Sequence, residues 1–194
     1  QLYPGVRTLR MDADTTRTKD SYEKILSAFS NGEADVLIGT QMIVKGHDFP
    51  KVTLVGILAA DLSLNASDYR AGERTFQLLT QPVGRAGRGV LPGEAVIQTY
   101  QPDHYAITCA AAQDYKSFYE EEILYRELSG YPPAAHMLAV QIYGKEEENV
   151  KQLARRLTDV VKSNMDFLQI LGPTPANISK INDIYRYVFY AKHA

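Results

Sequence analysis

Apolar and polar residues alternate along the first 100 residues in blocks that predict strands and helices in turn. Residues 35–39 and 52–58 are mostly apolar runs without polar alternation, which are typical of strands buried in a parallel sheet. Residues 6–10 predict a shorter strand, and residues 94–100 predict another that alternates only in its second half. Helices between successive strands imply right-handed crossovers and a parallel sheet.

Between these strands, apolar positions recur with helical spacing. One apolar face has the spacing i, i+3, i+4 and i+7, and we expect its residues in the core; they are Tyr22, Ile25, Leu26 and Phe29. The candidate caps of this helix are Asp14, Thr15 and Thr16. Residues 67–79 predict a second helix, and we expect a turn to begin at Gln81, because Pro82 disfavours helical angles in the residue before it.

The second half of the chain has a different order of elements. Residues 104–128 predict a helix, which Tyr131-Pro132-Pro133 ends. A half-buried strand, an amphipathic helix and two more strands follow, and this βαββ order suggests a small α+β fold. These segments are residues 137–143, 149–162, 167–171 and 184–191, with a Gly-Pro-Thr-Pro break at 172–175.

We therefore predict an α/β protein in three parts. A parallel-sheet lobe covers residues 1–103, a helical connector covers residues 104–131, and a small α+β domain covers residues 132–194. The last strand-like run has no turn signal after it, so we expect the small domain to be truncated in this chain.

Composition narrows the class of protein. The chain has 194 residues, 45% hydrophobic and 23% charged, which is typical of a globular protein with a substantial core. It has no apolar run of about 18 residues and no signal-peptide pattern, so we expect no membrane partner. The single Cys109 excludes an internal disulfide and favours the cytoplasm. Because the net charge is −2, any contact with nucleic acid needs a local basic patch.

Residues 81–89 read Gln-Pro-Val-Gly-Arg-Ala-Gly-Arg-Gly and carry the most specific chemistry in the chain. Arg85 and Arg88 are three residues apart, and guanidinium groups form paired hydrogen bonds with phosphate oxygens. Gly84 and the glycines after it let the backbone approach a ligand closely. Gly-Arg repeats also occur in solvated turns, but the fixed spacing that begins at Gln81 favours a phosphate-facing arginine pair.

A second group of polar residues follows the strand predicted at residues 35–39, where ligands of parallel α/β sheets bind. The candidates there are Thr40, Gln41, Lys45, Gly46 and Asp48. Taken singly, Lys45 is also typical of a solvated surface, and Thr40 of a strand-end cap. Asp61 follows the next predicted strand and is either functional or a cap of the following turn.

These two motifs resemble the last two signature motifs of superfamily 2 helicases. With three further stretches, the chain resembles over essentially its whole length the C-terminal portion of the primosomal protein N-prime (PriA) family of bacterial primosome-assembly DNA helicases. The five matching stretches are residues 10–16, 39–50, 81–88, 126–133 and 171–176.

The resemblance implies that residues 1–103 form the second RecA-like lobe of an ATP-dependent 3′-to-5′ DNA helicase that restarts stalled replication forks. It makes Arg85 and Arg88 catalytic residues, which would stabilise charge on ATP held by an absent first lobe. It assigns contacts with ATP to Gly46, Asp48, Gln81 and Gly84. It assigns contacts with the DNA backbone to Thr40, Gln41 and Lys45.

The same resemblance places the cofactors outside this chain. The loop Gly-x-x-x-x-Gly-Lys-Ser/Thr and the Asp-Glu pair that hold ATP and Mg²⁺ are missing from this sequence. The family's zinc-binding cysteines are missing too, so zinc would belong to the upstream region of a full-length protein and no metal to this chain. We expect the isolated chain to be inactive as an ATP hydrolase.

The last sixty residues match the family's C-terminal domain, which implies several partners: single-stranded and forked DNA, the single-stranded DNA-binding protein and other primosome proteins. Arg186 and Tyr187 are candidate DNA-binding residues beside Tyr185 and Tyr190, because bases stack on aromatic rings and phosphates attract cations. For about half of these residues, a place in the core on the aromatic face of a strand is a better explanation than DNA binding.

Two other functions stay open. The lobe could belong to another superfamily 2 translocase, such as a fork-reversal or repair helicase. Alternatively, it could serve as a non-catalytic scaffold for a protein partner.

Overall fold

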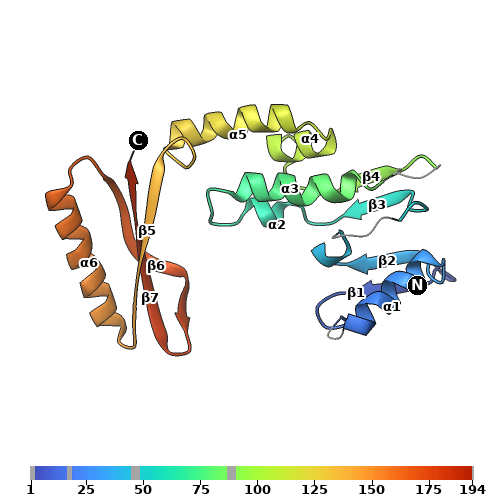
Figure 1. Cartoon of the computed structure of the whole chain (residues 1–194), viewed down its shortest axis with the longest axis horizontal. Helices are drawn as coiled ribbons and strands as arrows, with labels where there is room; N and C mark the ends of the chain where they lie inside the picture. Colours follow the sequence, from blue (N-terminus) through green and yellow to red (C-terminus); the bar gives the residue numbers. More distant parts are fainter. Residues whose placement is uncertain (1–2, 17–18, 45–48, 87–90, 194) are drawn as a thin grey trace. The chain divides into compact units, whose positions relative to one another are not determined.

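A computed structural model of the chain describes residues 3–16, 19–44, 49–86 and 91–193 (Figure 1). The chain divides into two compact units. Unit 1 consists of Gln1–Leu64 and Glu73–Asp114, and unit 2 of Asn65–Gly72 and Tyr115–Ala194. None of the helices in the described part of the chain is long and apolar enough to cross a membrane.

Unit 1 contains two pairs of parallel strands. The strands are β1 (Thr8–Met11), β2 (Val36–Gly39), β3 (Leu54–Ile57) and β4 (Glu94–Ile97). β1 pairs with β2 and β3 with β4, so the predicted strands and their parallel direction are confirmed. We expected one buried sheet, whereas the described ladders form two separate pairs. Ile38 is 56% exposed and Leu54 is 62% exposed, so the prediction that these runs are buried is wrong.

The core of unit 1 includes Met11 of β1, which is fully buried, and residues of its helices. These helices are α1 (Lys19–Ser30), the short 3₁₀ helix η1 (Gln41–Val44), α2 (Asp61–Leu64), α3 (Ala71–Val83), whose first two residues belong to unit 2, and α4 (Tyr105–Ala111). Phe76 and Leu79 of α3 are buried, as is Ile107 of α4. On α1, Leu26 is buried and the ring of Phe29 packs edge-on against Phe49 at 5.1 Å.

The helix α3 continues through Gln81 and Pro82, so the turn that we expected at Gln81 is wrong. A proline in the last turn of a helix removes one backbone hydrogen bond. Burial of the Pro82 ring favours the helical position in spite of that loss. The hydrogen-bond ladder resumes immediately, because Gly84 N donates to Thr80 O at 3.0 Å.

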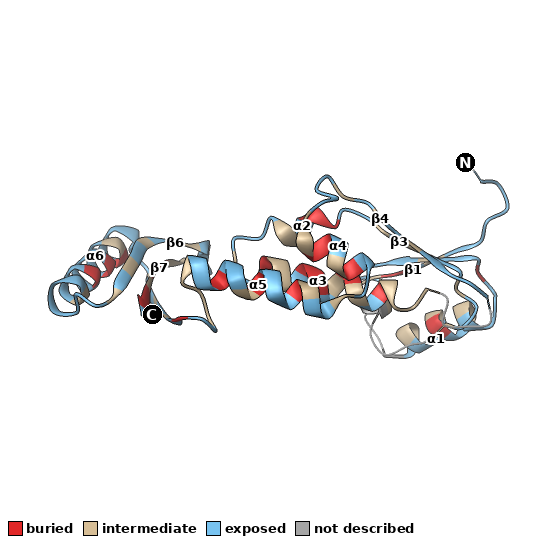
Figure 2. Cartoon of the chain, turned by 90° about the horizontal axis from the view of Figure 1, so that it is seen from above, coloured by how far each residue is buried: buried red, intermediate tan, exposed pale blue. Residues whose placement is uncertain are grey.

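Unit 2 is a three-stranded antiparallel sheet with helices. Its elements are α5 (Tyr115–Ser129), β5 (His136–Gly144), α6 (Glu147–Asn164), β6 (Gln169–Ile181) and β7 (Ile184–His193). The strand order is β5-β7-β6, and the predicted βαββ order is confirmed. Ile142, Tyr187 and Phe189 form its core with Val150 and Ala154 of α6, whose buried residues are seen in Figure 2.

The Gly-Pro-Thr-Pro segment lies inside β6 and does not end a strand, contrary to our expectation. β6 is an edge strand, and proline is tolerated at an edge because its missing N–H would otherwise face solvent. The pairing with β7 shifts register between Leu171 and Thr174. Gly172 has φ +98°, and a Cβ there would lie 3.0 Å from Val188 O, so both its conformation and its surroundings require glycine.

Within unit 2, residues Asn65–Gly72 contact the rest of the unit through Tyr69. The rings of Tyr69 and Tyr131 stack with centroids 5.1 Å apart, and the guanidinium of Arg126 lies 5.2 Å from the Tyr69 ring. Arg126 also forms a buried ion pair with Glu122 at 2.6 Å. The Lys192 ammonium lies 3.5 Å from the centre of the Tyr131 ring. We call these five residues the Tyr69 cluster.

Candidate functional site

The predicted arginine motif begins on the last turn of α3. Gln81 is exposed on that helix, and Gly84 and Arg85 form a turn in which Arg85 N donates to Pro82 O at 3.0 Å. Arg85 is half-buried. Arg88 lies outside the described residues, so the structure places one of the two predicted catalytic arginines.

Gly84 stands where the backbone of α3 meets a side chain from after α4. A Cβ at Gly84 would lie 3.1 Å from Gln113 Oε1 and 3.2 Å from Thr80 O. Both distances are tighter than ordinary van der Waals contact. The first glycine of the motif therefore has a packing role, and no feature of the sequence near Gly84 indicates Gln113 as its neighbour.

The second predicted group follows β2. A Cβ at Gly39 would lie 2.1 Å from Met11 O, so only glycine allows the chain to turn here into η1. Thr40 and Gln41 come next and are exposed, and Thr40 O accepts a hydrogen bond from Ile43 N at 3.1 Å. Lys45, Gly46 and Asp48 lie outside the described residues. Thr40 and Gln41 thus occupy the carboxyl end of a parallel strand, as predicted.

Asp61 has a structural role. Its carboxylate accepts hydrogen bonds from the Thr99 hydroxyl at 2.7 Å and from Tyr100 N at 3.0 Å. These bonds, the one from Thr99 first, lower the pKa of the Asp61 carboxyl. Asp61 begins α2 just after β3 and is buried, so it ties that end of β3 to the residues following β4.

The stretch after β1 closes on itself around Asp12. The Asp12 carboxylate accepts hydrogen bonds from Asp14 N and Thr15 N, and these contacts with an ion pair to Arg10 lower its pKa, the bond from Thr15 N most strongly. The Thr15 and Thr16 hydroxyls both donate to Asp12 O. These three predicted helix caps thus make local contacts in the turn before α1.

In unit 2 the candidate DNA-binding residues lie on β7, where successive side chains face opposite sides of the sheet. Tyr187 is only 8% exposed, and its hydroxyl donates to Glu147 Oε1 at 3.2 Å. Its ring belongs to the core, so its assignment to a DNA-stacking surface is wrong. Arg186 is half-buried and donates to Gln141 Oε1 at 3.0 Å. Tyr185 and Tyr190 are also half-buried.

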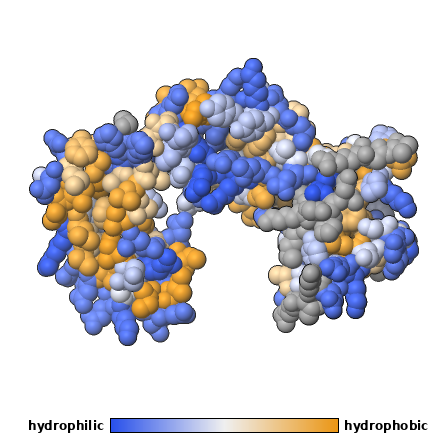
Figure 3. All heavy atoms as spheres, in the orientation of Figure 1, coloured by the Kyte–Doolittle hydropathy of each residue, from blue (hydrophilic) through white to orange (hydrophobic). Residues whose placement is uncertain are grey.

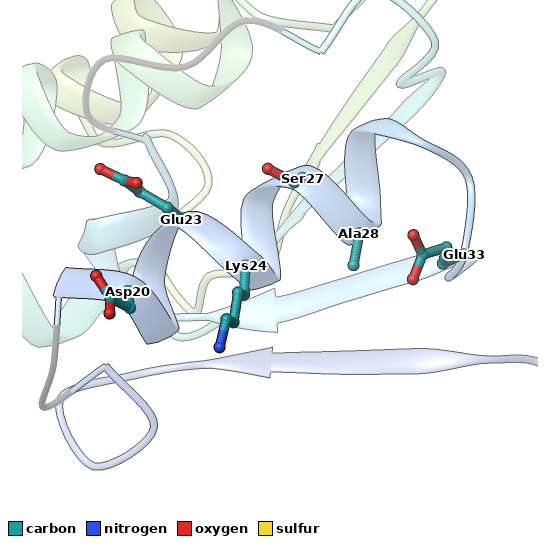
Figure 4. A pocket seen from close by; sticks show the side chains of 6 residues that line it. All are labelled: Asp20, Glu23, Lys24, Ser27, Ala28 and Glu33. Carbon is teal, nitrogen blue, oxygen red and sulfur yellow. The ribbon is translucent and has the colours of Figure 1, made fainter.

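A hollow of about 580 Å³ lies along α1 (Figure 4). It is lined by Asp20, Glu23, Lys24, Ser27, Ala28 and Glu33, none of which is a predicted site residue. Three carboxylates against one ammonium do not suit a phosphate. Among the described residues, no group of three or more acidic, histidine or cysteine side chains could hold a metal ion.

Two sequence families match the chain. The helicase conserved C-terminal domain matches residues 1–90, and the primosomal protein N C-terminal domain matches residues 127–194.

Individual relatives match along the whole chain. The replication restart protein PriA of Bacillus subtilis (strain 168) is 45% identical over 194 residues, which are 100% of this chain and 24% of the relative. The PriA of Chlamydia pneumoniae is 46% identical over 195 residues, 100% of this chain and 26% of the relative. The PriA of Haemophilus influenzae is 37% identical over 193 residues, 99% of this chain and 26% of the relative.

The α/β region thus has the sequence of a helicase C-terminal domain. The chain belongs to the PriA family of replication restart proteins and corresponds to the C-terminal region of that family. It spans about a quarter of the length of the relatives named above.

Proposed function

We propose that this chain is the second motor lobe and C-terminal domain of an ATP-dependent 3′-to-5′ DNA helicase that acts in replication restart and primosome assembly. In this proposal, ATP and Mg²⁺ bind to a first lobe that this chain does not contain. Arg85 and Arg88 then reach the phosphates across the interface between the lobes. Zinc, where the full-length protein binds it, belongs to the upstream region.

The observation that carries the proposal is the position of the arginine motif at the end of α3. A packed helix with buried Phe76 and Leu79 leads directly into Gly84 and Arg85. Such a helix holds the start of the turn in one place, and a guanidinium so held needs little reorganisation when charge develops on a phosphoryl group. Gln81, one helical turn earlier and exposed, would contact the nucleotide from the same helix end.

The DNA contacts are proposed for two places. Thr40 and Gln41 are exposed at the end of β2 and would bind the backbone of the tracked strand, together with Lys45. Contacts with the backbone position a protein on DNA without reading its sequence. Arg186 would add a contact from unit 2, where the domain would bind forked DNA, the single-stranded DNA-binding protein or other primosome proteins.

The test uses a full-length family protein that contains this sequence. We expect Arg85→Ala and Arg88→Ala each to lower DNA-stimulated ATP hydrolysis by roughly 10³–10⁵-fold, the range found for arginines that stabilise a transferring phosphoryl group. DNA binding without nucleotide should stay unchanged in both variants. Arg156→Ala, at an exposed arginine of α6, is the matched control and should keep full hydrolysis.

Full hydrolysis in both arginine variants would leave a scaffold function as the better explanation. The chain by itself, without the first lobe, should show no Mg²⁺-dependent ATP hydrolysis. Sustained turnover by the isolated chain would contradict the proposed division of labour between the lobes.

A further inference from the structure

Gln113 occupies a backbone position that usually belongs to glycine. It follows α4 and has φ +56°, in the left-handed region. Gln113 N donates to Ala110 O at 3.1 Å, and Asp114 N donates to Cys109 O at 2.9 Å. This pair of hydrogen bonds is the Schellman motif, in which glycine is the usual left-handed residue because it has no Cβ. Gln113 therefore carries backbone strain that a glycine would avoid.

The side chain of Gln113 joins the ends of two helices. Its Nε2 donates to Thr80 O of α3 at 3.0 Å and to Ala110 O of α4 at 3.1 Å. Each of these carbonyls also accepts a backbone hydrogen bond, so the amide is a second donor to both helix ends. Thr80 O also accepts the hydrogen bond from Gly84 N, so the amide closes α3 at the point where the arginine turn begins.

Gly84 and Gln113 fit each other. The amide oxygen of Gln113 lies 3.1 Å from the position that a Cβ of residue 84 would take. Any side chain at 84 would press on the amide that holds Thr80 O. Arg85 follows this contact directly, and its own N donates to Pro82 O. The contact therefore sets the path of the backbone from which the Arg85 side chain leaves.

We propose that Gln113 is a positioning residue for Arg85. It is no catalytic residue, because its amide contacts helix carbonyls; it fixes the last turn of α3 so that the guanidinium leaves in one direction. This inference rests on the proposed function of Arg85. Loss of the Gln113 side chain should lower the rate of ATP hydrolysis and leave the binding of ATP and of DNA unchanged.

The informative variant is Gln113→Gly, because it removes the amide and also relieves the left-handed backbone. In a full-length family protein that contains this sequence, we expect kcat for DNA-stimulated ATP hydrolysis to fall roughly tenfold to a hundredfold, the effect of displacing a catalytic group by about 1 Å. KM for ATP should stay within about twofold, and the unfolding midpoint within about 4 °C of the parent. A purely structural role would lower stability and activity together.

The control is Asn182→Gly, at φ +47° in the turn between β6 and β7. It relieves the same kind of backbone strain and should leave kcat unchanged. A double-variant test uses Arg85→Lys, which keeps a charge and so leaves measurable turnover. If Gln113 acts through Arg85, adding Gln113→Gly to Arg85→Lys should lower kcat by less than about twofold further, since coupled residues are not additive.

The outcomes separate the two proposals. If Arg85→Lys leaves hydrolysis unchanged, the proposed function fails, and this inference fails with it. If Arg85→Lys lowers kcat but Gln113→Gly does not, or if the two effects multiply in the double variant, the positioning role of Gln113 alone is overturned.

Discussion

The two units hold their strands in different ways. In unit 2, β7 is paired on both edges, whereas the strands of unit 1 form two separate pairs. Phe189 of β7 is 2% exposed, whereas large apolar side chains of β2 and β3 lie at the surface. The core of unit 1 combines Met11 of β1, which is fully buried, with buried residues of its helices, such as Phe76, Leu79 and Ile107. The difference is therefore one between a three-stranded sheet with a doubly paired central strand and two separate pairs of strands.

Polar ties at strand ends distinguish unit 1 further. Arg7 binds Asp35 through its backbone N and its guanidinium, which joins the residue before β1 to the residue before β2. Asp61 ties the ends of β3 and β4. Segments that bind ligands come from the less stable parts of proteins. We therefore expect unit 1, which carries most of the predicted site, to open locally more often than unit 2.

Hydrogen exchange tests the comparison of the two units most directly. Amides in the middle of β7 should exchange roughly 100-fold more slowly than those of β2, since about 3 kcal/mol of additional opening free energy corresponds to that factor. Exchange measured by mass spectrometry on peptides of the whole chain would show it. Equal protection of the two strands would contradict the expectation that unit 1 opens locally more often than unit 2.

Phe189→Ala tests whether the sheet of unit 2 forms its core. Removing this buried ring should lower the free energy of unfolding of unit 2 by roughly 3–5 kcal/mol. The midpoint of urea unfolding, followed by exchange of α6 and β7 peptides, would measure the loss. Leu138→Ala, at a position 62% exposed on β5, is the control and should cost less than about 1 kcal/mol.

The buried ion pair between Glu122 and Arg126 is expected to stabilise the helical part of unit 2. Glu122→Ala leaves the Arg126 guanidinium buried without its carboxylate, which should cost about 3 kcal/mol. Glu120→Ala is the matched control, because its pair with Lys116 is exposed and 3.9 Å long, and should cost less than about 0.5 kcal/mol. If urea unfolding showed the same loss of unfolding free energy in both variants, burial of the pair would not contribute to stability.

The smallest expected effect is in acid and concerns unit 1. Hydrogen bonds from the Arg7 side chain, then from its backbone, lower the pKa of Asp35 to about 2. Since this folded-state pKa lies below the usual value of about 3.9, the carboxylate stabilises the fold above about pH 4, and the contribution is lost as pH falls toward 2. Asp35→Asn should therefore flatten the pH dependence of unit 1 unfolding between pH 4 and 2. Asp103→Asn, at an exposed loop position, should keep the slope of the parent.

Strand direction and the βαββ order were predictable because both depend on the local order of apolar and polar residues. Burial of the parallel runs was not, because an apolar run does not show how many strands will flank it. The path of β6 through Gly172 also escaped prediction, because proline is excluded from central strands and tolerated at edges, and the sequence does not tell which strand is at the edge.

The candidate site was predictable only in its local part. The Arg85 turn and the exposed Thr40 follow from spacing and strand ends. Alternation along β7 does not separate Arg186 from Tyr187, because Tyr187, Val188 and Phe189 are all buried. Gln113 could not be predicted. Its partner Thr80 is 33 residues away, and the glycine-like conformation of Gln113 is visible only in the structure.

The membership of residues Asn65–Gly72 in unit 2 has a practical consequence. The polypeptide passes from one unit to the other three times, at 64/65, 72/73 and 114/115. A truncation that begins at residue 115 therefore removes Tyr69 from its stack on Tyr131, and it exposes the flank of Arg126 to water. A fragment designed to contain unit 2 should therefore include residues Asn65–Gly72 as well as Tyr115–Ala194. Without the first segment, we expect the fragment to be less stable.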